Sequence, residues 1–155
     1  MPRPSVEFAK TICKPNSVIV EVGVDRGEHA RQMCKVLQPS LIYLVDIVNR
    51  CIGRFEFTYP HIFIEKHSQV AALEVPNNLD FVYIDGVESE YDTMIDIACW
   101  YPKVKIGGVI GGHDFKVNEL NGAYRAVKII FKDFSYNTNE GYTDWWVIKQ
   151  KERYI

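Results

Sequence analysis

Short runs of apolar, β-branched residues alternate with segments of helical spacing along almost the whole chain of 155 residues. The expected strands are Ser17–Val22, Leu41–Val45, His61–Glu65, Leu79–Ile84, Gly107–Ile110, Phe134–Tyr136 and Trp145–Ile148. The expected helices are Glu28–Leu37, Asn49–Phe57, Gln69–Leu73, Glu88–Trp100 and Leu120–Phe131. Such alternation is typical of right-handed βαβ units, which build a parallel sheet with helices on both faces. Only a short polar turn separates the last two strands, so we expect them to pair antiparallel as an edge hairpin.

Apolar residues at helical spacing predict which side of each helix faces the core. The predicted inward positions are Ala30, Met33, Cys34 and Leu37 in the first helix, Tyr91, Met94, Ile95, Ala98 and Cys99 in the fourth, and Ala123, Ala126, Val127 and Ile130 in the last. We expect at least two of the three tryptophans to pack in the core, because large aromatic side chains bury well there.

The composition is 47% hydrophobic and 25% charged, with a net charge of −2, which is typical of one soluble domain over residues 1–155 with its core in 17–149. The N-terminal MPRPSVEF carries no secretory signal, and no apolar run has the length of a membrane span. The four cysteines are far apart, so we expect reduced, mostly buried thiols in a cytoplasmic protein and no zinc site. The charge balance gives no strong signal for nucleic acid.

In an open α/β sheet, ligands bind beyond the carboxyl ends of the strands, so the polar residues that follow strands are the candidate site. These residues are Glu21, Gly23 and Gly27 after the first strand, Asp46 after the second, His67 and Ser68 after the third, Asp85 and Gly86 after the fourth, and His113 and Asp114 after the fifth.

The loop after the first strand, GVDRG, predicts a close approach of backbone to a ligand, because glycine carries no Cβ. Asp46 follows Gly23 by 23 residues, a separation at which an acidic side chain accepts hydrogen bonds from ribose hydroxyls. The carboxylates of Glu21 and Asp25 would repel a pyrophosphate but suit the amino group and sulfonium of S-adenosylmethionine. The loop therefore favours a methyl donor over NAD.

Two stretches resemble a known family. EVGVDRGEHA resembles the first motif, E/D-x-G-x-x-x-G, of the class I S-adenosylmethionine-dependent methyltransferases. LDFVYIDGVESEYDTMIDIACWYPKVKIGGVIGGHDF resembles a subgroup with IDG and GGvi…hDf motifs, which includes small-molecule O-methyltransferases. The resemblance covers roughly Ser17 to Lys149. It implies a Rossmann-like, three-layer α/β/α sandwich with a mostly parallel, seven-stranded sheet and a C-terminal antiparallel hairpin.

The resemblance also assigns roles at matching positions. Residues lining the methionine half of the cofactor would be Glu21, Gly23, Asp25 and Gly27. Asp46 would bind the ribose, with Ile47 against the adenine and Ser68 approaching the adenine from the next loop. Asp85 would lie beneath the methyl-transfer point, or would ligate a metal in those relatives that use one.

This chain departs from its apparent relatives in two places. Val87 and Glu88 follow IDG where many relatives have Asp-His or a similar pair, and His67 stands beside Ser68 where relatives often carry an acid. A Mg²⁺ site built from Asp85 and Asp114, with His113 or Asn118 as a third ligand, is one reading. In the other, Asp114 caps the next segment and Asp85 supports the cofactor.

Methyl transfer to a hydroxyl needs a base, and His113 is the candidate because its ordinary pKa is near neutrality. The alternative is a histidine hydrogen-bonded to a neighbouring loop; His29 and His61 are expected to be structural or surface residues.

The predicted function is O-methylation of a small-molecule acceptor. The alternatives are a catalytically degenerate binding module and, less favoured, an NAD-dependent oxidoreductase. Only about fifteen residues precede the first strand, so we expect an open site, or one completed by a second subunit of a homo-oligomer or by a partner.

Overall fold

The computed structural model describes residues 1–51, 57–87, 89–137 and 143–150. Seven strands are present there: β1 (Val18–Val22), β2 (Leu41–Asp46), β3 (His61–Glu65), β4 (Leu79–Ile84), β5 (Val104–Gly112), β6 (Ser135–Asn137) and β7 (Asp144–Ile148). The helices are α1 (Pro4–Lys10), α2 (Glu28–Leu37), α3 (Ser68–Glu74), α4 (Glu90–Trp100) and α5 (Gly122–Ile130), with a 3₁₀ turn, η1, at Tyr101–Lys103.

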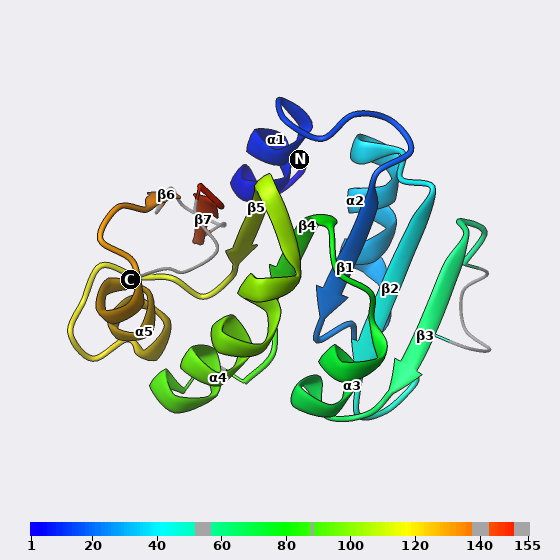
Figure 1. Cartoon of the computed structure of the whole chain (residues 1–155). Helices are drawn as coiled ribbons and strands as arrows, with labels where there is room; N and C mark the ends of the chain where they lie inside the picture. Colours follow the sequence, from blue (N-terminus) through cyan, green and yellow to red (C-terminus); the bar gives the residue numbers. More distant parts are fainter. Residues whose placement is uncertain (52–56, 88, 138–142, 151–155) are drawn as a thin grey trace.

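The strands form one sheet in the order β3-β2-β1-β4-β5-β7-β6 (Figure 1). The first five strands of this order pair in parallel, and β7 pairs antiparallel with both β5 and β6. The order reverses at β1, where the chain first builds outward to β3 and then crosses back to β4. The sequence prediction of a mostly parallel sheet with a closing antiparallel pair is confirmed.

Alternate residues of each strand enter two separate cores, because successive side chains of a strand point to opposite faces. Val20 and Val22 of β1 pack with residues of α3, α4 and α5, whereas Ile19 packs with residues of α1 and α2. The two helical layers therefore lie on opposite faces of the sheet (Figure 1). This arrangement confirms the three-layer α/β/α architecture.

Helix α1 is the element that the sequence did not predict. Its seven residues are too few to be stable alone, so the helix depends on tertiary packing. Val6 and Ala9 are buried against the core on the α2 side of the sheet, and Ser5 is bonded to Asp144. The N-terminal segment consequently reaches the carboxyl ends of β4 and β5.

The predicted inward face of the fourth helix is wrong. Tyr91 is 72% exposed, Ala98 is exposed, and the buried residues of α4 are Thr93, Asp96, Ile97 and Trp100. The inward faces predicted for α2 and α5 are confirmed, although Ile130 is only half-buried. The helix predicted over Asn49–Phe57 lies mostly outside the described residues, as does Glu88. Helix α4 begins at Glu90, and the Ser89 side chain caps it by accepting from the amide of Asp92.

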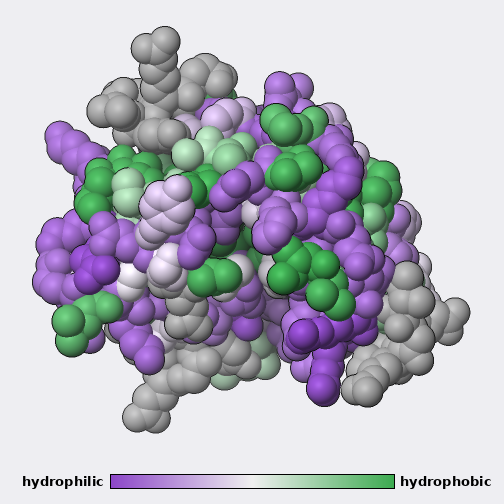
Figure 2. Space-filling view, turned by 90° about the horizontal axis from the view of Figure 1, so that it is seen from below, coloured by the Kyte–Doolittle hydropathy of each residue, from purple (hydrophilic) through white to green (hydrophobic). Residues whose placement is uncertain are grey.

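The remaining core predictions are mostly confirmed. Trp100 and Trp145 are fully buried, and the four cysteines are free, two of them buried. Within the described residues, no helix combines the length and apolarity that crossing a membrane requires. The parallel strands end at the lower edge of Figure 1, and Figure 2 looks onto that edge, where hydrophilic residues are interspersed with small hydrophobic groups.

Candidate functional site

A cavity of about 720 Å³ opens at the carboxyl ends of β1, β2 and β4. Its lining brings together most of the predicted cofactor residues, namely Glu21, Gly23, Asp25, Asp46, Ile47, Ser68 and Asp85. Seven residues with carboxylates and three with lysine or arginine side chains line it. The cavity is therefore acidic, which favours a cationic ligand.

Gly23 is required by the packing of two loops. It has a φ of +84°, and a Cβ built there would lie 2.1 Å from the backbone oxygen of Asp85. The amide of Gly23 donates to the carbonyl of Val45 at 2.8 Å, and that of Asp85 donates to Val22 at 2.7 Å. The sequence analysis attributed this glycine to the approach of a ligand, whereas its closest neighbour in the structure is the chain that follows β4.

Asp46 organises the glycine loop. Its Oδ2 accepts hydrogen bonds from the amides of Val24 at 2.8 Å and Asp25 at 2.9 Å, and its Oδ1 accepts one from Val48 at 3.3 Å. Asp25 itself lies at positive φ and pairs with Arg50 through side chains that are each 64% exposed. Asp46, which is predicted to bind the ribose, thus lines the cavity and also fixes the shape of the loop after β1.

Glu21 forms a buried pair with His29. Oε1 of Glu21 lies 2.7 Å from Nδ1 of His29, and the two side chains are 1% and 10% exposed. Burial raises the pKa of Glu21 well above its ordinary value, and burial together with the charge of Arg3 lowers that of His29 to about 3. Oε2 of Glu21 has no hydrogen-bond partner among the described residues. One oxygen of a buried carboxyl group in the cavity lining is therefore available to a ligand.

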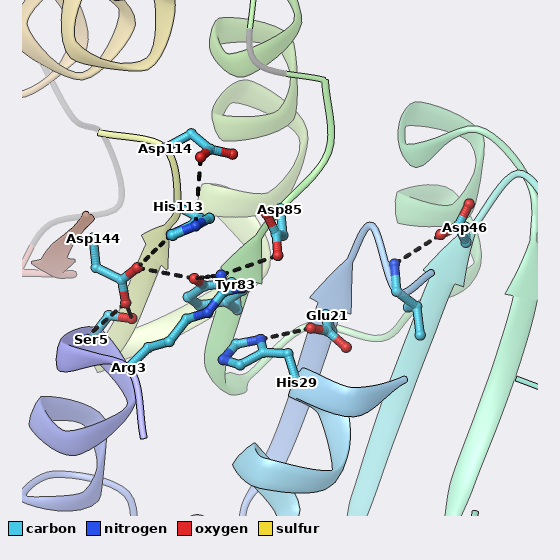
Figure 3. A network of polar contacts seen from close by, with 11 residues as sticks. Arg3, Ser5, Glu21, His29, Asp46, Tyr83, Asp85, His113, Asp114 and Asp144 are labelled. Carbon is cyan, nitrogen blue, oxygen red and sulfur yellow. Dashed lines mark hydrogen bonds and ion pairs between the residues drawn. The ribbon is translucent and has the colours of Figure 1, made fainter. Parts of the chain in front are cut away.

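Arg3 enters the cavity lining from the start of α1 (Figure 3). Its NH1 donates to the Tyr83 hydroxyl and, at 3.1 Å, to Oδ2 of Asp85. The guanidinium also lies over the Tyr83 ring, 5.4 Å from its centre. Arg3 thereby compensates the charge of Asp85, and it fixes the end of the N-terminal segment on β4.

Asp144, the first residue of β7, is fully buried and receives four hydrogen bonds. The donors are the amide and hydroxyl of Ser5, the hydroxyl of Tyr83 at 3.1 Å and Nδ1 of His113 at 3.1 Å (Figure 3). Burial opposes ionisation of Asp144, but the bonds from His113 and Ser5 hold its pKa below the ordinary value. An ionised carboxylate only accepts, so Nδ1 of His113 carries the proton in this pair.

His113 follows β5 and lies beside Tyr83 and Asp85 (Figure 3). Burial acts to lower its pKa, but the hydrogen bond to Asp144 and the charges of Asp114 and Asp85 outweigh that effect, and the pKa lies above the ordinary value. Nε2 of His113 makes no hydrogen bond in the described parts of the chain, and Oδ1 of Asp114 lies 3.5 Å from it. Arg3 and Asp85 line the cavity, whereas His113 is not one of the described residues that line it.

The donor set does not fit Mg²⁺ in its present arrangement. Mg²⁺ prefers oxygen ligands, yet Asp85 is engaged by the guanidinium of Arg3 and Asp114 faces His113. The side chains that do converge within the described residues are Glu21, His29 and Asp85, whose ligand atoms lie within 4.8 Å of one another. The Asp85–Asp114 metal site stays a prediction.

Ser68 begins α3 and lies at the other side of the cavity. Its hydroxyl accepts a hydrogen bond from Nε1 of Trp100 at 2.7 Å and interacts with the buried carboxyl of Asp96. Ile47, after β2, is 59% exposed and lines the same cavity. Both residues therefore line the same cavity as Asp46, and their contact with an adenine stays a prediction.

Sequence reasoning missed four site residues: Arg3, Tyr83, Asp96 and Asp144. It also assigned His29 only a structural or surface role, whereas His29 lines the cavity and pairs with Glu21. An acid directly before the last strand was a signal for Asp144. Nothing local in the sequence marks Arg3, because its place depends on how α1 docks.

The fold and the site define a Rossmann-like α/β protein with an acidic cavity at the point where strand order reverses. Residues 20–115 match the model of a family described as a methyltransferase domain. The chain belongs to this methyltransferase-domain family. No curated protein matches the sequence.

Solved structures share the fold at low sequence identity. An rRNA methylase from Streptococcus thermophilus is 13% identical, with a TM-score of 0.70 over 95% of each chain. A candidate methyltransferase from Streptococcus mutans, solved in complex with S-adenosylhomocysteine, is 12% identical, with a TM-score of 0.70 over 92% of this chain and 93% of that one. A SAM-dependent O-methyltransferase from Thermotoga maritima is 10% identical, with a TM-score of 0.71 over 96% of this chain and 65% of that one. At such identities these likenesses show the fold.

Proposed function

We propose that this protein transfers the methyl group of S-adenosylmethionine to a hydroxyl of a small-molecule acceptor. The observation that carries the proposal is the acidic cavity over the glycine loop, where seven carboxylate residues face three basic ones. S-adenosylmethionine has a sulfonium and an ammonium group, so its amino-acid end matches this charge. The same acidity disfavours the pyrophosphate of a dinucleotide, and also a nucleic-acid backbone.

In this proposal, different residues of the cavity bind different groups of the cofactor. Glu21 offers a buried, unpartnered oxygen to the ammonium group, and Asp46 offers its carboxylate to the ribose hydroxyls. Asp85 lies next to Gly23 across the loop contact and would face the methyl-transfer point. When bound, the cofactor supplies a methyl carbon activated by the adjoining positive sulfur.

His113 acts as the general base in this proposal. The acceptor hydroxyl gives its proton to Nε2 of His113, while an oxygen lone pair forms the new bond to carbon and the carbon–sulfur electron pair stays on sulfur. Asp144 holds Nδ1–H of His113, which leaves the lone pair on Nε2. Because His113 lies beside Asp85, which lines the cavity, the acceptor would bind next to Asp85, between the cavity and His113.

The cofactor assignment is tested by thermal unfolding with S-adenosylhomocysteine, with NAD and without ligand. Ligand at a hundred times its Kd should stabilise the protein by about 2.7 kcal/mol. Glu21→Gln should weaken S-adenosylhomocysteine binding about 10- to 100-fold, because it replaces a carboxyl oxygen by an amide whose NH₂ group cannot accept from the ammonium group. Glu119→Gln is the matched control, because Glu119 is an exposed partner of Lys128 and does not line the cavity, and this variant should bind like the wild type.

The acceptor is tested by methylation assays over phenols, sugars and RNA, with and without Mg²⁺. Absence of any stabilisation by millimolar S-adenosylhomocysteine would overturn the methyltransferase proposal. Cofactor binding without turnover on any acceptor of the panel would favour the degenerate binding module. Methylation of RNA in preference to small hydroxyl compounds would replace the proposed acceptor class.

A further inference from the structure

His29 is a buried histidine of the cavity lining to which the function proposed above gives no role. It is the second residue of α2, and its Nδ1 lies 2.7 Å from Oε1 of Glu21 in β1 (Figure 3). Its ring also lies against the ring of Tyr83, with 4.3 Å between the centroids. Because the side chains of Glu21 and His29 are 1% and 10% exposed, loss of either partner would leave the other with an unmet hydrogen bond.

The contact with His29 decides which oxygen of Glu21 is left for a ligand. Oε1 of Glu21 is engaged by His29, whereas Oε2 is buried and has no hydrogen-bond partner in the described parts of the chain. The last side-chain torsion of a glutamate is broad and roughly two-fold, so the carboxyl group turns easily unless a neighbour holds one oxygen. His29 is such a neighbour, and its ring is itself packed against Tyr83. The orientation of Oε2 therefore depends on His29.

Glu21 lacks a full positive charge as its partner. Arg3, the nearby cation, is engaged by Tyr83 and Asp85, and no described lysine or arginine forms an ion pair with Glu21. The titratable groups that act on the Glu21–His29 pair are Arg3 of α1, Cys34 of α2, Asp46 of β2, Asp85 after β4, His113 after β5 and Asp144 of β7. Asp46 and Asp85 raise the pKa of Glu21, and Arg3 lowers it. A cationic group of a ligand would supply the charge that Glu21 lacks.

Without a ligand, the pair of Glu21 and His29 is uncharged. Burial raises the pKa of Glu21 well above its ordinary value, and burial followed by the charge of Arg3 lowers the pKa of His29 to about 3. Both shifts favour the uncharged form, so near pH 6 Glu21 keeps a proton and His29 is a neutral imidazole. A cation beside Oε2 acts in the opposite direction, because a nearby positive charge favours the carboxylate.

We propose that His29 is a positioning residue that holds Oε1 of Glu21, so that Oε2 accepts a hydrogen bond from the amino group of the cofactor. The inference rests on the proposed function and deepens it. On binding, the carboxyl group of Glu21 gives its proton to solvent and becomes a carboxylate. The ammonium group of the cofactor keeps its three protons and shares one with Oε2, while neutral His29 donates Nδ1–H to Oε1. A ligand with the amino group should therefore release about one proton when it binds.

The test compares S-adenosylhomocysteine with 5′-methylthioadenosine, which lacks the amino-acid group, by calorimetry at pH 6. The heats of binding in buffers of different ionisation enthalpy give the number of protons released. The wild type should release about one proton more with S-adenosylhomocysteine than with 5′-methylthioadenosine. Asp96, whose pKa is about 6, also lines the cavity, but both ligands share its contribution. Glu21→Gln should abolish the difference, because glutamine has no proton to lose.

Three histidine variants test the positioning role. His29→Phe keeps a ring beside Tyr83 but removes Nδ1, so S-adenosylhomocysteine should bind about 10- to 100-fold more weakly, and 5′-methylthioadenosine at most about threefold more weakly. His29→Asn offers an amide N–H near the place of Nδ1 and should recover the wild-type affinity to within about threefold. His61→Phe is the matched control, because His61 is exposed and does not line the cavity, and both affinities should stay unchanged.

The outcomes separate this proposal from the proposed function. If the wild type binds neither nucleoside, the cofactor assignment fails. If it binds both and releases equal numbers of protons, or if Glu21→Gln keeps the difference, Glu21 does not supply the proton and the inference is overturned. Equal losses of both ligands in His29→Phe, or no recovery in His29→Asn, would mean that His29 only maintains the structure of the cavity.

Discussion

Nδ1 of His113 lies 3.1 Å from Oδ1 of Asp144, so the chain after β5 and the first residue of β7 share one hydrogen bond. The same carboxylate binds the amide and hydroxyl of Ser5, which belong to α1. Asp144 therefore connects three segments that are far apart in the sequence. It sets the tautomer of the proposed base and the position of the N-terminal helix together.

Replacing Asp144 by asparagine should test this connection. An amide cannot accept from all four donors, and its own NH₂ group would face them, so we expect a loss on the order of 2–4 kcal/mol in the free energy of unfolding. Hydrogen exchange at Val6 and Ala9 should become faster, because α1 loses its bonds at Ser5. Asp114→Asn is the matched control and should change stability little, since Asp114 is partly exposed and asparagine tolerates its positive φ. Equal exchange rates in α1 of Asp144→Asn and wild type would refute the connection.

Two glycines with the same φ allow the cost of backbone strain to be distinguished from the cost of a steric clash at an added Cβ. Gly23 and Gly107 both have a φ of +84°, but a Cβ at Gly107 has no heavy atom within 4 Å. Gly107→Ala should cost about 1–2 kcal/mol from the left-handed conformation alone. Gly23→Ala should cost about 3 kcal/mol or more, because the collision with Asp85 adds to that strain. Urea unfolding measures both, and similar losses would show that the loop after β4 yields to the methyl group.

Arg3 tunes the charge of the cavity from outside the predicted motifs. S-adenosylmethionine carries one positive charge more than S-adenosylhomocysteine, so Arg3→Met should raise the affinity ratio of the first to the second. We expect a change of about two- to tenfold at low ionic strength, and a smaller one in high salt. Lys128→Met, far from the cavity on α5, serves as the control variant in the same calorimetric titrations. An unchanged ratio would mean that the charge of the Arg3 guanidinium has no measurable effect on binding of the sulfonium.

Asp96 should give the protein a measurable acid dependence. Because its pKa is raised to about 6 in the folded chain, the folded state keeps a proton that the unfolded state loses near pH 4. Stability contributed by this protonation is present at low pH and is lost as the pH rises through about 6. The loss between pH 4 and pH 7 should be on the order of 2–3 kcal/mol. Asp96→Asn should lack that loss, whereas Asp92→Asn should retain it, as measured by denaturant unfolding across this pH range.

The sheet was predictable because the pattern of residues that specifies its strands is local in the sequence. Apolar runs such as those of β1 and β4 alternate with helices, and this pattern decides the architecture whatever the details of packing. The α4 face was not predictable in the same way. Thr93 and Asp96 are polar yet buried, and Asp96 lies at Ser68 and lines the cavity, so hydrophobic spacing selected the wrong side of the helix.

The candidate site was predictable only where a strand ends in a motif. Glu21, Asp46 and Asp85 follow their strands directly, and the topology brings them to one cavity. Arg3 and Asp144 reach the site through the docking of α1 and the antiparallel pairing of β7. Neither event is encoded in a short stretch of sequence, since α1 docks through contacts such as Arg3–Asp85, which are 82 positions apart, and β7 pairs with β5 across more than thirty positions.

The docking of α1 has a consequence for how the protein would lose activity. A seven-residue helix held by a few tertiary contacts is a natural unit of local unfolding, which needs far less free energy than opening the sheet. When α1 detaches, Arg3 leaves Asp85 and Ser5 leaves Asp144, while the glycine loop keeps its bonds to Asp46. Mild heat or denaturant should therefore abolish turnover before it abolishes cofactor binding, with the acceptor side and the cofactor side melting as separate cooperative units.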